Sequence, residues 1–283
     1  MPLLKLACAI ATCILAAPFA PREVARHPQL EIERVVATAG GELLLARSAL
    51  DFPVTVSIEL EEAENARAQW EGDGLGVVVP PRGVALLGRV APLRGSAPYR
   101  YRWREQWWAG ARDATPDPES AYRSPLAIPA RVVQGFHGEP SHRGADAYAV
   151  DLQCPLGTAV HAARSGLVVE LREDSDRGGA DPALRDEANF VRLLHADGTL
   201  GFYAHFARNG VEVELGQRVT AGAALGRTGS SGWMGEPHLH FAVALADARH
   251  GWRSIPFRFE RVGAPPAEPR EGELLRGALG SAR

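Results

Sequence analysis

The N-terminal third of the chain alternates apolar and polar residues over several short stretches, which is the pattern of half-buried β-strands. In residues 54–61, every second position is Val, Ile or Leu, and the positions between carry Thr, Ser or Glu. In residues 99–104, aromatic residues alternate with arginines, and a turn with two prolines follows residues 77–79. Short strands separated by turn signals predict an N-terminal β-sandwich-like domain over residues 28–112.

A second series of predicted strands belongs to a domain expected at residues 131–260. A linker rich in Pro and Asp precedes it at residues 113–130, and a tail rich in Pro, Glu, Arg and Gly follows at residues 261–283. The composition of this tail predicts disorder. With two β-rich domains and no helical periodicity, the expected fold class is all-β, built from antiparallel sheets. The strands of the second domain are predicted at residues 147–152, 166–171, 189–194, 201–206 and 238–245.

The first 20 residues have the layout of a secretory signal peptide, with one lysine before an apolar run at residues 6–17. This run is shorter than the ~20 apolar residues of a membrane span, and an uncleaved N-terminal anchor is the alternative. Cleavage removes two of the three cysteines and leaves Cys154 alone, which excludes an intramolecular disulfide. We therefore expect a secreted or periplasmic protein without membrane contact after signal cleavage.

Charge gives little reason to expect a nucleic-acid partner. The formal net charge of the chain is -3, so it carries no basic excess. One local exception is the predicted sheet face formed by Arg100, Arg102 and Arg104. This stripe either binds an anionic polymer or lies in solvent, and the usual exposure of arginine favours solvent.

The most informative positions are His238 and His240, near the start of the last predicted strand. Side chains alternate faces along a strand, so both imidazoles point the same way. Leu239 and Phe241 then point to the opposite, core-facing side. Two imidazoles on one face suit one metal ion and the water that it activates, although a solvated strand face is the simpler alternative.

Asp151 is the second unusual residue. Its apolar neighbours, residues 148–152, indicate burial, and a buried carboxylate is costly unless it is paired or bound to metal. A salt bridge to an arginine would also satisfy it. The chain contains nine histidines, and two of them, His137 and His142, lie in a loop shortly before this strand.

Several blocks of the second domain together resemble the lysostaphin-like zinc endopeptidases, a family of peptidoglycan endopeptidases. The resemblance covers residues 134–245, and the preceding β-rich segment resembles the N-terminal domain of a secreted subgroup of that family. The resemblance implies that the second domain is an antiparallel β-sheet peptidase domain with a groove. The matching blocks are residues 141–142, 148–151, 155–158, 162–166, 189–191, 195–198, 203–205, 226–229 and 237–241.

The resemblance also implies roles for particular residues. Asp151 and His240 match two zinc ligands of the family, and His205 and His238 match its two catalytic histidines, which lie beside the water. The remaining ligand is often a histidine four residues before the aspartate, but this chain has Ala147 there. Relatives with an insertion before the aspartate carry Ser-His at the place of His142, so we expect His142 to be the ligand. His137 is the second candidate.

The implied function is that of a secreted zinc metalloendopeptidase with one Zn²⁺ per chain. It would hydrolyse peptide bonds in the stem peptides or cross-links of peptidoglycan through a metal-activated water. One of His205 and His238 would act as general base, and the other would donate a hydrogen bond to the carbonyl oxygen. The alternatives are a catalytically inactive relative that binds cell wall or activates an amidase, a zinc peptidase that cleaves a protein, and a structural β protein.

Two loops bear on access to the expected site. The glycine-rich loop at residues 226–235 is either a groove wall for an extended peptide or a surface turn, because glycine lets a backbone approach closely. Trp233 in this loop is either a groove aromatic or a packing residue. We also hypothesise that the loop at residues 141–148 partly gates access to the metal.

Overall fold

A computed structural model of the chain describes residues 29–37, 40–72, 76–95, 97–247 and 249–277. The predicted leader at residues 1–20 lies outside this range. Within the described residues the regular structure is β apart from two short 3₁₀ helices, η1 (Gly144–Asp146) and η2 (Pro182–Glu187). The expected all-β class with antiparallel sheets is therefore confirmed.

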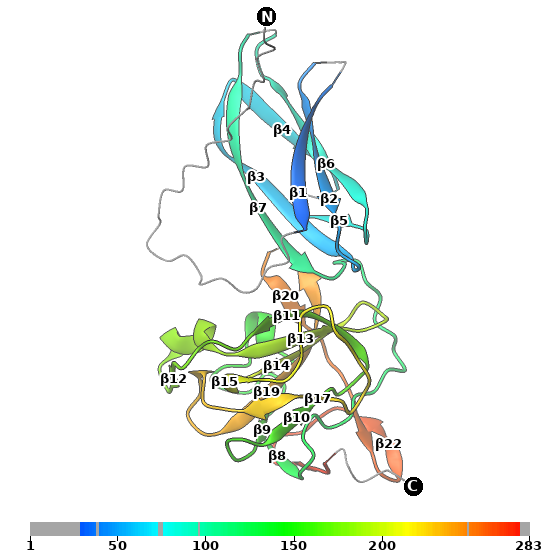
Figure 1. Cartoon of the computed structure of the whole chain (residues 1–283), viewed down its shortest axis with the longest axis vertical. Helices are drawn as coiled ribbons and strands as arrows, with labels where there is room; N and C mark the ends of the chain where they lie inside the picture. Colours follow the sequence, from blue (N-terminus) through cyan, green and yellow to red (C-terminus); the bar gives the residue numbers. More distant parts are fainter. Residues whose placement is uncertain (1–28, 38–39, 73–75, 96, 248, 278–283) are drawn as a thin grey trace, which may run out of the picture.

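The N-terminal part consists of two antiparallel sheets that share a core, and Figure 1 shows them in colours from blue to green. Side chains from both sheets meet in this core, among them Leu44, Val54, Val56 and Leu87, none of which is exposed. The first sheet has the order β1-β2-β6-β4 and the second β5-β3-β7. These strands are β1 (Leu30–Val36), β2 (Glu42–Ser48), β3 (Val54–Glu64), β4 (Ala66–Trp70), β5 (Val77–Val79), β6 (Val84–Pro92) and β7 (Arg100–Ala109).

The arginine stripe of β7 lies on the exposed face of the second sheet. Arg100, Arg102 and Arg104 each form an ion pair with a glutamate of the neighbouring strand β3. Exposed ion pairs of this kind stabilise little, about 0–1 kcal/mol each. The pairing favours a solvated sheet face over a binding surface for an anionic polymer.

The second part of the chain is built on a nine-stranded antiparallel sheet with the order β16-β11-β13-β14-β19-β9-β8-β23, and β20 pairs with β19. A three-stranded sheet, β10-β17-β15, packs against it, and two two-stranded pairs complete the described strands. The strands of the large sheet are β8 (Ala130–Gln134), β9 (Ala149–Gln153), β11 (Gly166–Arg172), β13 (Phe190–Leu194), β14 (Leu200–Ala204), β16 (Arg218–Val219), β19 (His238–Asp247), β20 (Gly251–Ser254) and β23 (Leu274–Leu275). The others are β10 (Ala159–His161), β12 (Gly178–Gly179), β15 (Phe206–Val211), β17 (Ala224–Thr228), β18 (Gly232–Trp233), β21 (Phe259–Arg261) and β22 (Ala264–Ala267).

The five strands predicted for this part all exist, with bounds that differ by one or two residues at most ends. The main difference lies at His205, which the prediction placed inside a strand. His205 has a φ of 72° and lies between the end of β14 and the start of β15, so the chain turns at this residue. A left-handed backbone is uncommon for a residue with a side chain, and such residues cluster at functional sites.

The alternation predicted for β19 is confirmed. Leu239 and Phe241 are fully buried, whereas His238 and His240 on the other face are partly exposed. Phe241 packs against Tyr203, Phe257 and Phe259, with ring centroids 5.0–5.7 Å apart. This aromatic cluster fixes the strand from behind and so holds the histidine face in place.

Two segments differ from the expectations drawn from composition. The expected linker contains Tyr122 and Leu126, which are 3% and 0% exposed and belong to the core of the second part. The expected disorder of the tail does not hold over residues 261–277, because the chain there forms β22 and β23. β23 pairs with β8, and the buried side chain of Leu275 anchors this part of the tail to the domain.

The two parts are in contact. Leu167, Val169, Leu200 and Ala244 belong to the large sheet, yet they are buried in the same apolar cluster as the sandwich core. The N-terminal sandwich therefore covers one end of the large sheet, near β20 and β11 in Figure 1.

Candidate metal centre

The central strands of the large sheet bring the predicted ligands together. β19 and β9 pair antiparallel, and their register places His240 directly opposite Asp151. Side chains of directly opposed residues lie on the same face of a sheet. The two residues are 89 positions apart in the chain, and the Nδ1 atom of His240 lies 3.0 Å from the Oδ1 atom of Asp151.

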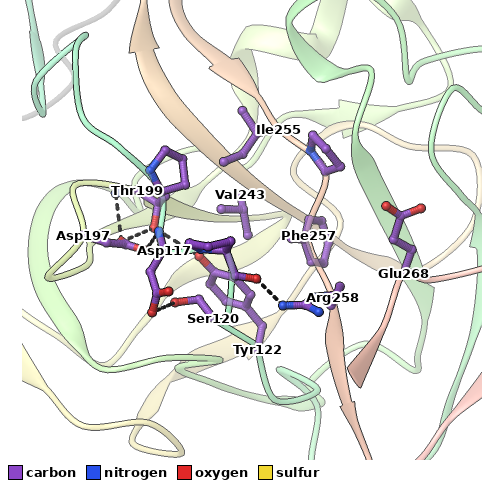
Figure 2. A pocket seen from close by; sticks show the side chains of 13 residues that line it. Asp117, Ser120, Tyr122, Asp197, Thr199, Val243, Ile255, Phe257, Arg258 and Glu268 are labelled. Carbon is purple, nitrogen blue, oxygen red and sulfur yellow. Dashed lines mark hydrogen bonds between the residues drawn. The ribbon is translucent and has the colours of Figure 1, made fainter. Parts of the chain in front are cut away.

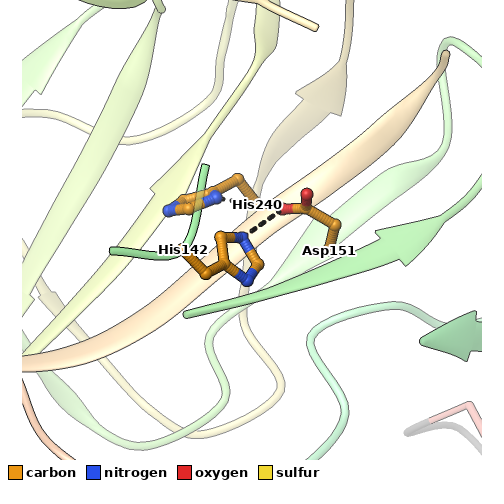
Figure 3. A group of neighbouring side chains, drawn as sticks. All are labelled: His142, Asp151 and His240. Atoms are coloured by element: carbon orange, nitrogen blue, oxygen red, sulfur yellow. Dashed lines mark hydrogen bonds and ion pairs between the residues drawn. The ribbon is translucent and has the colours of Figure 1, made fainter. Parts of the chain in front are cut away.

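His142 reaches the same carboxylate from the loop before β9. Its Nε2 atom lies 3.3 Å from Oδ1 of Asp151, and its side chain is not exposed. Its Nδ1 atom lies 2.8 Å from the carbonyl oxygen of Gly135 and donates to it, so Nε2 is the ring nitrogen that faces the carboxylate. Figure 3 shows the two imidazoles converging on one side of the Asp151 carboxylate.

This group fits a metal ion. One ligand atom from each of His142, Asp151 and His240 lies within 4.8 Å of the others. Two imidazoles and one carboxylate are a donor set found at catalytic zinc sites, which keep a further position open. Burial alone would raise the pKa of Asp151, but hydrogen bonds from His142 and His240 outweigh it and hold the pKa well below its ordinary value. The carboxylate is therefore ionised, as a metal ligand must be.

His137, the second candidate for the first ligand, is not part of this group. It has a φ of 58°, and its ring contacts Tyr148, with centroids 4.7 Å apart. The backbone N–H of His137 donates to the carbonyl of Ala147, at 2.6 Å. The loop therefore directs His142 toward Asp151 and His137 toward an aromatic side chain.

His205 and His238 lie beside the cluster. Their ring centroids are 4.7 Å apart, and the Nε2 atom of His238 is 3.5 Å from Oδ1 of Asp151. The Nδ1 atoms of both rings lie 2.7 Å from backbone carbonyl oxygens, those of Ser231 and Glu236 respectively. Burial lowers the pKa of His205 to about 3, so its imidazole is neutral at neutral pH.

A surface depression continues from the cluster. It is lined by residues of β8, β9 and the loop before β19: Val133, Gln134, Asp151, Gln153, Gly235, Glu236, Pro237 and His238. Beyond it, the loop at 226–235 pairs with the segment 173–188, because β12 and β18 form a short parallel pair. Trp233 donates its indole N–H to the carbonyl of Ala180, at 3.1 Å, so it packs against this segment.

Two residues of this region were not predicted from the sequence. Asp146 on η1 is 4% exposed, and its Oδ1 atom lies 3.9 Å from Nε2 of His240. Its carboxylate also pairs with Arg185 of η2. Only one feature of the sequence could have drawn attention to Asp146. It lies next to Ala147, the residue that departs from the family pattern.

A second pocket shares no residue with the cluster. The pocket in Figure 2 lies against the expected linker, and most of its polar side chains already have partners. Tyr122 hydrogen-bonds Thr199, and Thr199 donates to Asp197, which Arg164 also contacts. These bonds hold the linker against the sheet, and we assign the pocket no chemistry.

Comparison with known proteins relates part of the second half of the chain to a family. Residues 145–250 match peptidase family M23. This range includes Asp151, His205, His238 and His240 but begins after His142.

Three curated relatives illustrate the match. Glycyl-glycine endopeptidase ALE-1 of Staphylococcus capitis is 35% identical over 99 residues, which are 35% of this chain and 24% of the relative. Peptidoglycan DD-endopeptidase ShyA of Vibrio cholerae is 28% identical over 95 residues, 34% of this chain and 19% of the relative. Cell division protein DipM of Caulobacter vibrioides is 32% identical over 97 residues, 34% and 14% of the two chains. The chain thus spans a quarter or less of the length of these relatives.

Among solved structures, the antimicrobial peptidase lysostaphin from Staphylococcus simulans aligns with 44% of this chain and 46% of its own. The sequence identity is 26%, and the TM-score is 0.32. The catalytic domain of the M23 protein EnpA from Enterococcus faecalis aligns with 48% of this chain and 95% of its own, with 23% identity and a TM-score of 0.37.

Proposed function

We propose that this chain, whose residues 145–250 form a peptidase family M23 domain, is a secreted zinc metalloendopeptidase that hydrolyses peptide bonds of bacterial peptidoglycan. One observation carries the proposal: the ligand atoms of His142, Asp151 and His240 lie within 4.8 Å of one another, beside two further histidines. A structural role would not require five polar residues to converge at the edge of a surface depression.

In this proposal His142 Nε2, Asp151 Oδ1 and His240 Nδ1 hold the metal, as the distances among these atoms suggest. Zinc, when bound, supplies Lewis acidity, which lowers the pKa of a coordinated water toward 7 and polarises a peptide carbonyl. The backbone carbonyl of Gly135 fixes the tautomer of His142, so this ligand needs no reorganisation to bind.

His205 and His238 are proposed to move the protons. Since the Nδ1 atom of each donates to a backbone carbonyl, each Nε2 atom offers a lone pair toward the cluster. One histidine can then accept the proton of the attacking water. The other, once protonated, can donate a hydrogen bond to the oxygen of the tetrahedral intermediate. The left-handed backbone of His205 fixes its direction, which favours a preorganised role.

The proposed substrate is a stem peptide or cross-link of peptidoglycan. Relatives named glycyl-glycine endopeptidase and peptidoglycan DD-endopeptidase support this class. The depression beside His238 runs along residues of β8 and β9, next to the proposed ligand Asp151, and this position suits an extended peptide. Because this substrate lies outside the cytoplasm, we propose that the protein is exported through its predicted leader. Among the described residues, no helix is long and apolar enough to cross a membrane.

The proposal includes the domain assignment made from the sequence, with a sandwich at residues 28–112 and the peptidase at residues 131–260. It also favours activity over the alternative of an inactive relative that binds cell wall or activates an amidase. That alternative rested on the displaced first ligand, and His142 supplies an imidazole at 3.3 Å from Asp151 in its place.

The test is the metal content of the purified protein together with digestion of purified peptidoglycan. We expect one zinc per chain, lost in His142→Ala and kept in the matched variant His137→Ala. We expect new peptide ends in the digest, identified by mass spectrometry, which also gives the bond that is cleaved. Failure to bind zinc even when zinc is supplied would overturn the enzyme proposal.

A further inference from the structure

Asp146 is a buried carboxylate that the proposed chemistry leaves without a role. It lies at the end of η1, is 4% exposed, and its Oδ1 atom is buried without a hydrogen bond among the described residues. Burial of a carboxylate oxygen without a donor is costly, so such an atom in a folded protein calls for an explanation. The nearest ring nitrogen recorded for Oδ1 is Nε2 of His240, at 3.9 Å.

The two ring nitrogens of His240 face two different carboxylates. Its Nδ1 atom faces Oδ1 of Asp151, at 3.0 Å, inside the cluster. A neutral imidazole that binds a metal through Nδ1 carries its proton on Nε2. The N–H of His240 therefore points toward Asp146, away from the cluster.

In the other histidines of the site, the ring nitrogen remote from the cluster has a backbone acceptor. His142, His205 and His238 each place their remote nitrogen, Nδ1, 2.7–2.8 Å from a backbone carbonyl oxygen. Among the described residues, Nε2 of His240 makes no such hydrogen bond to a carbonyl, and the acceptor that faces it is the carboxylate of Asp146. Metal-bound histidines commonly donate their second N–H to a carboxylate or a carbonyl, which fixes the tautomer and the ring plane.

Asp146 is itself anchored from a distant part of the chain. Arg185 on η2 forms an ion pair with its other oxygen, Oδ2. Asp181 caps η2 by accepting a hydrogen bond from the N–H of Ala183, at 2.9 Å. The segment that carries η2 pairs with the 226–235 loop through β12 and β18. The aspartate thus has one oxygen held in place and one oxygen free to accept a hydrogen bond.

We propose that Asp146 is a positioning residue of the metal centre. Its Oδ1 atom accepts the Nε2–H hydrogen bond of His240 when the metal binds, and Arg185 holds the carboxylate at that place. Closing the distance from 3.9 Å to that of a hydrogen bond requires a shift of about 1 Å, and hydrogen bonds at active sites are often long until the complex forms. The carboxylate would make the imidazole a stronger ligand and fix the orientation of its ring. This inference rests on the metal site of the proposed function.

The test compares Asp146→Asn and Arg185→Gln with the control Asp176→Asn. Asp176 lies in the same segment as Arg185 and pairs with Arg208, at 3.1 Å, in an exposed position. Three readouts are needed: the zinc dissociation constant from competition with a chelator, the visible absorption of the cobalt-substituted protein, and the thermal midpoint of the metal-free protein.

We expect Asp146→Asn to weaken zinc binding by about 10- to 100-fold and to shift the cobalt bands, with a smaller loss for Arg185→Gln and none for the control. Unchanged zinc affinity with a lower thermal midpoint would show that Asp146 and Arg185 form only a structural salt bridge, and it would overturn the proposal. A cobalt spectrum that reports the loss of a ligand would also overturn it, because Asp146 would then bind the metal directly. If the wild-type protein binds no zinc, the proposed function itself fails, and that result is distinct from both.

Discussion

His195 provides a sharp test of how burial controls the pH dependence of stability. It follows β13, is 3% exposed, and packs edge-on against Tyr122 with ring centroids 5.6 Å apart. Its Nδ1 atom lies 2.9 Å from the carbonyl oxygen of Ser165, and its Nε2 atom is buried without a hydrogen bond. Burial lowers the pKa of His195 to about 4 from an ordinary value of 6.5.

The direction of the effect follows from proton uptake. Between pH 6.5 and about 4 the unfolded chain binds a proton at His195 and the folded chain does not. The group therefore contributes stability that is fully present above pH 6.5 and is lost as the pH falls toward 4. Since one pKa unit corresponds to about 1.4 kcal/mol, the whole contribution is about 3 kcal/mol. Close to half of it, about 1.4 kcal/mol, is lost by about pH 5.5.

The assay is urea unfolding in excess chelator, so that metal binding does not add its own pH dependence. The free energy of unfolding is measured from about pH 7.5 to 4.5 for the wild type, for His195→Gln, and for His250→Gln at an exposed position. From about pH 7.5 to about pH 5.5, we expect the free energy of unfolding of the wild type to fall by about 1.4 kcal/mol more than that of His195→Gln. A His195→Gln curve that stays parallel to the wild-type curve would refute the reasoning, and His250→Gln should be parallel.

Four further outcomes follow from the structure. Phe241→Ala should lower the free energy of unfolding by about 3–5 kcal/mol through a core cavity, and a loss below about 1 kcal/mol in urea melts would contradict this packing. The buried side chain of Asn189 forms hydrogen bonds with the backbone of Ser175 and Phe206. Asn189→Ala should therefore lower the free energy of unfolding by about 2 kcal/mol and speed proteolysis within residues 173–188. An unchanged digestion rate would count against this role. A Cβ at Gly178 would meet a backbone oxygen at 1.6 Å, so Gly178→Ala should separate β12 from β18 and red-shift tryptophan fluorescence, while an unshifted spectrum would contradict the pairing. Chelation should abolish peptidoglycan hydrolysis and lower the thermal midpoint, both restored by added zinc, and hydrolysis that survives chelation would remove the metal from the mechanism.

Much of the site could be predicted because strand geometry is local. Alternation in β19 required only the identities of four consecutive residues, and it placed His238 and His240 on one face. The apolar neighbours of Asp151 indicated burial in the same way. The choice between His142 and His137 was harder, because both lie in one loop and only its folded path decides which imidazole reaches the aspartate.

The features that were missed depend on distant contacts. The ion pair between Asp146 and Arg185 joins residues 39 positions apart on two short 3₁₀ helices, and no periodicity reports such a contact. The burial of Leu275 is another case, since the edge of β8 provides a place for it that composition cannot reveal. Tertiary context overrides composition at both positions.

The apolar cluster shared by the sandwich and the large sheet limits how freely these parts can be exchanged. A modular protein can trade one domain for another if only a linker joins them, but here Leu200 and Ala244 depend on sandwich residues for their cover. Gly251 allows the indole of Trp108 to approach so closely that an added Cβ would lie 2.4 Å from its nitrogen. Recombination of this peptidase with a foreign N-terminal domain would therefore succeed only when the recipient sheet surface is redesigned with it, and the two parts are expected to have diverged as one inherited unit.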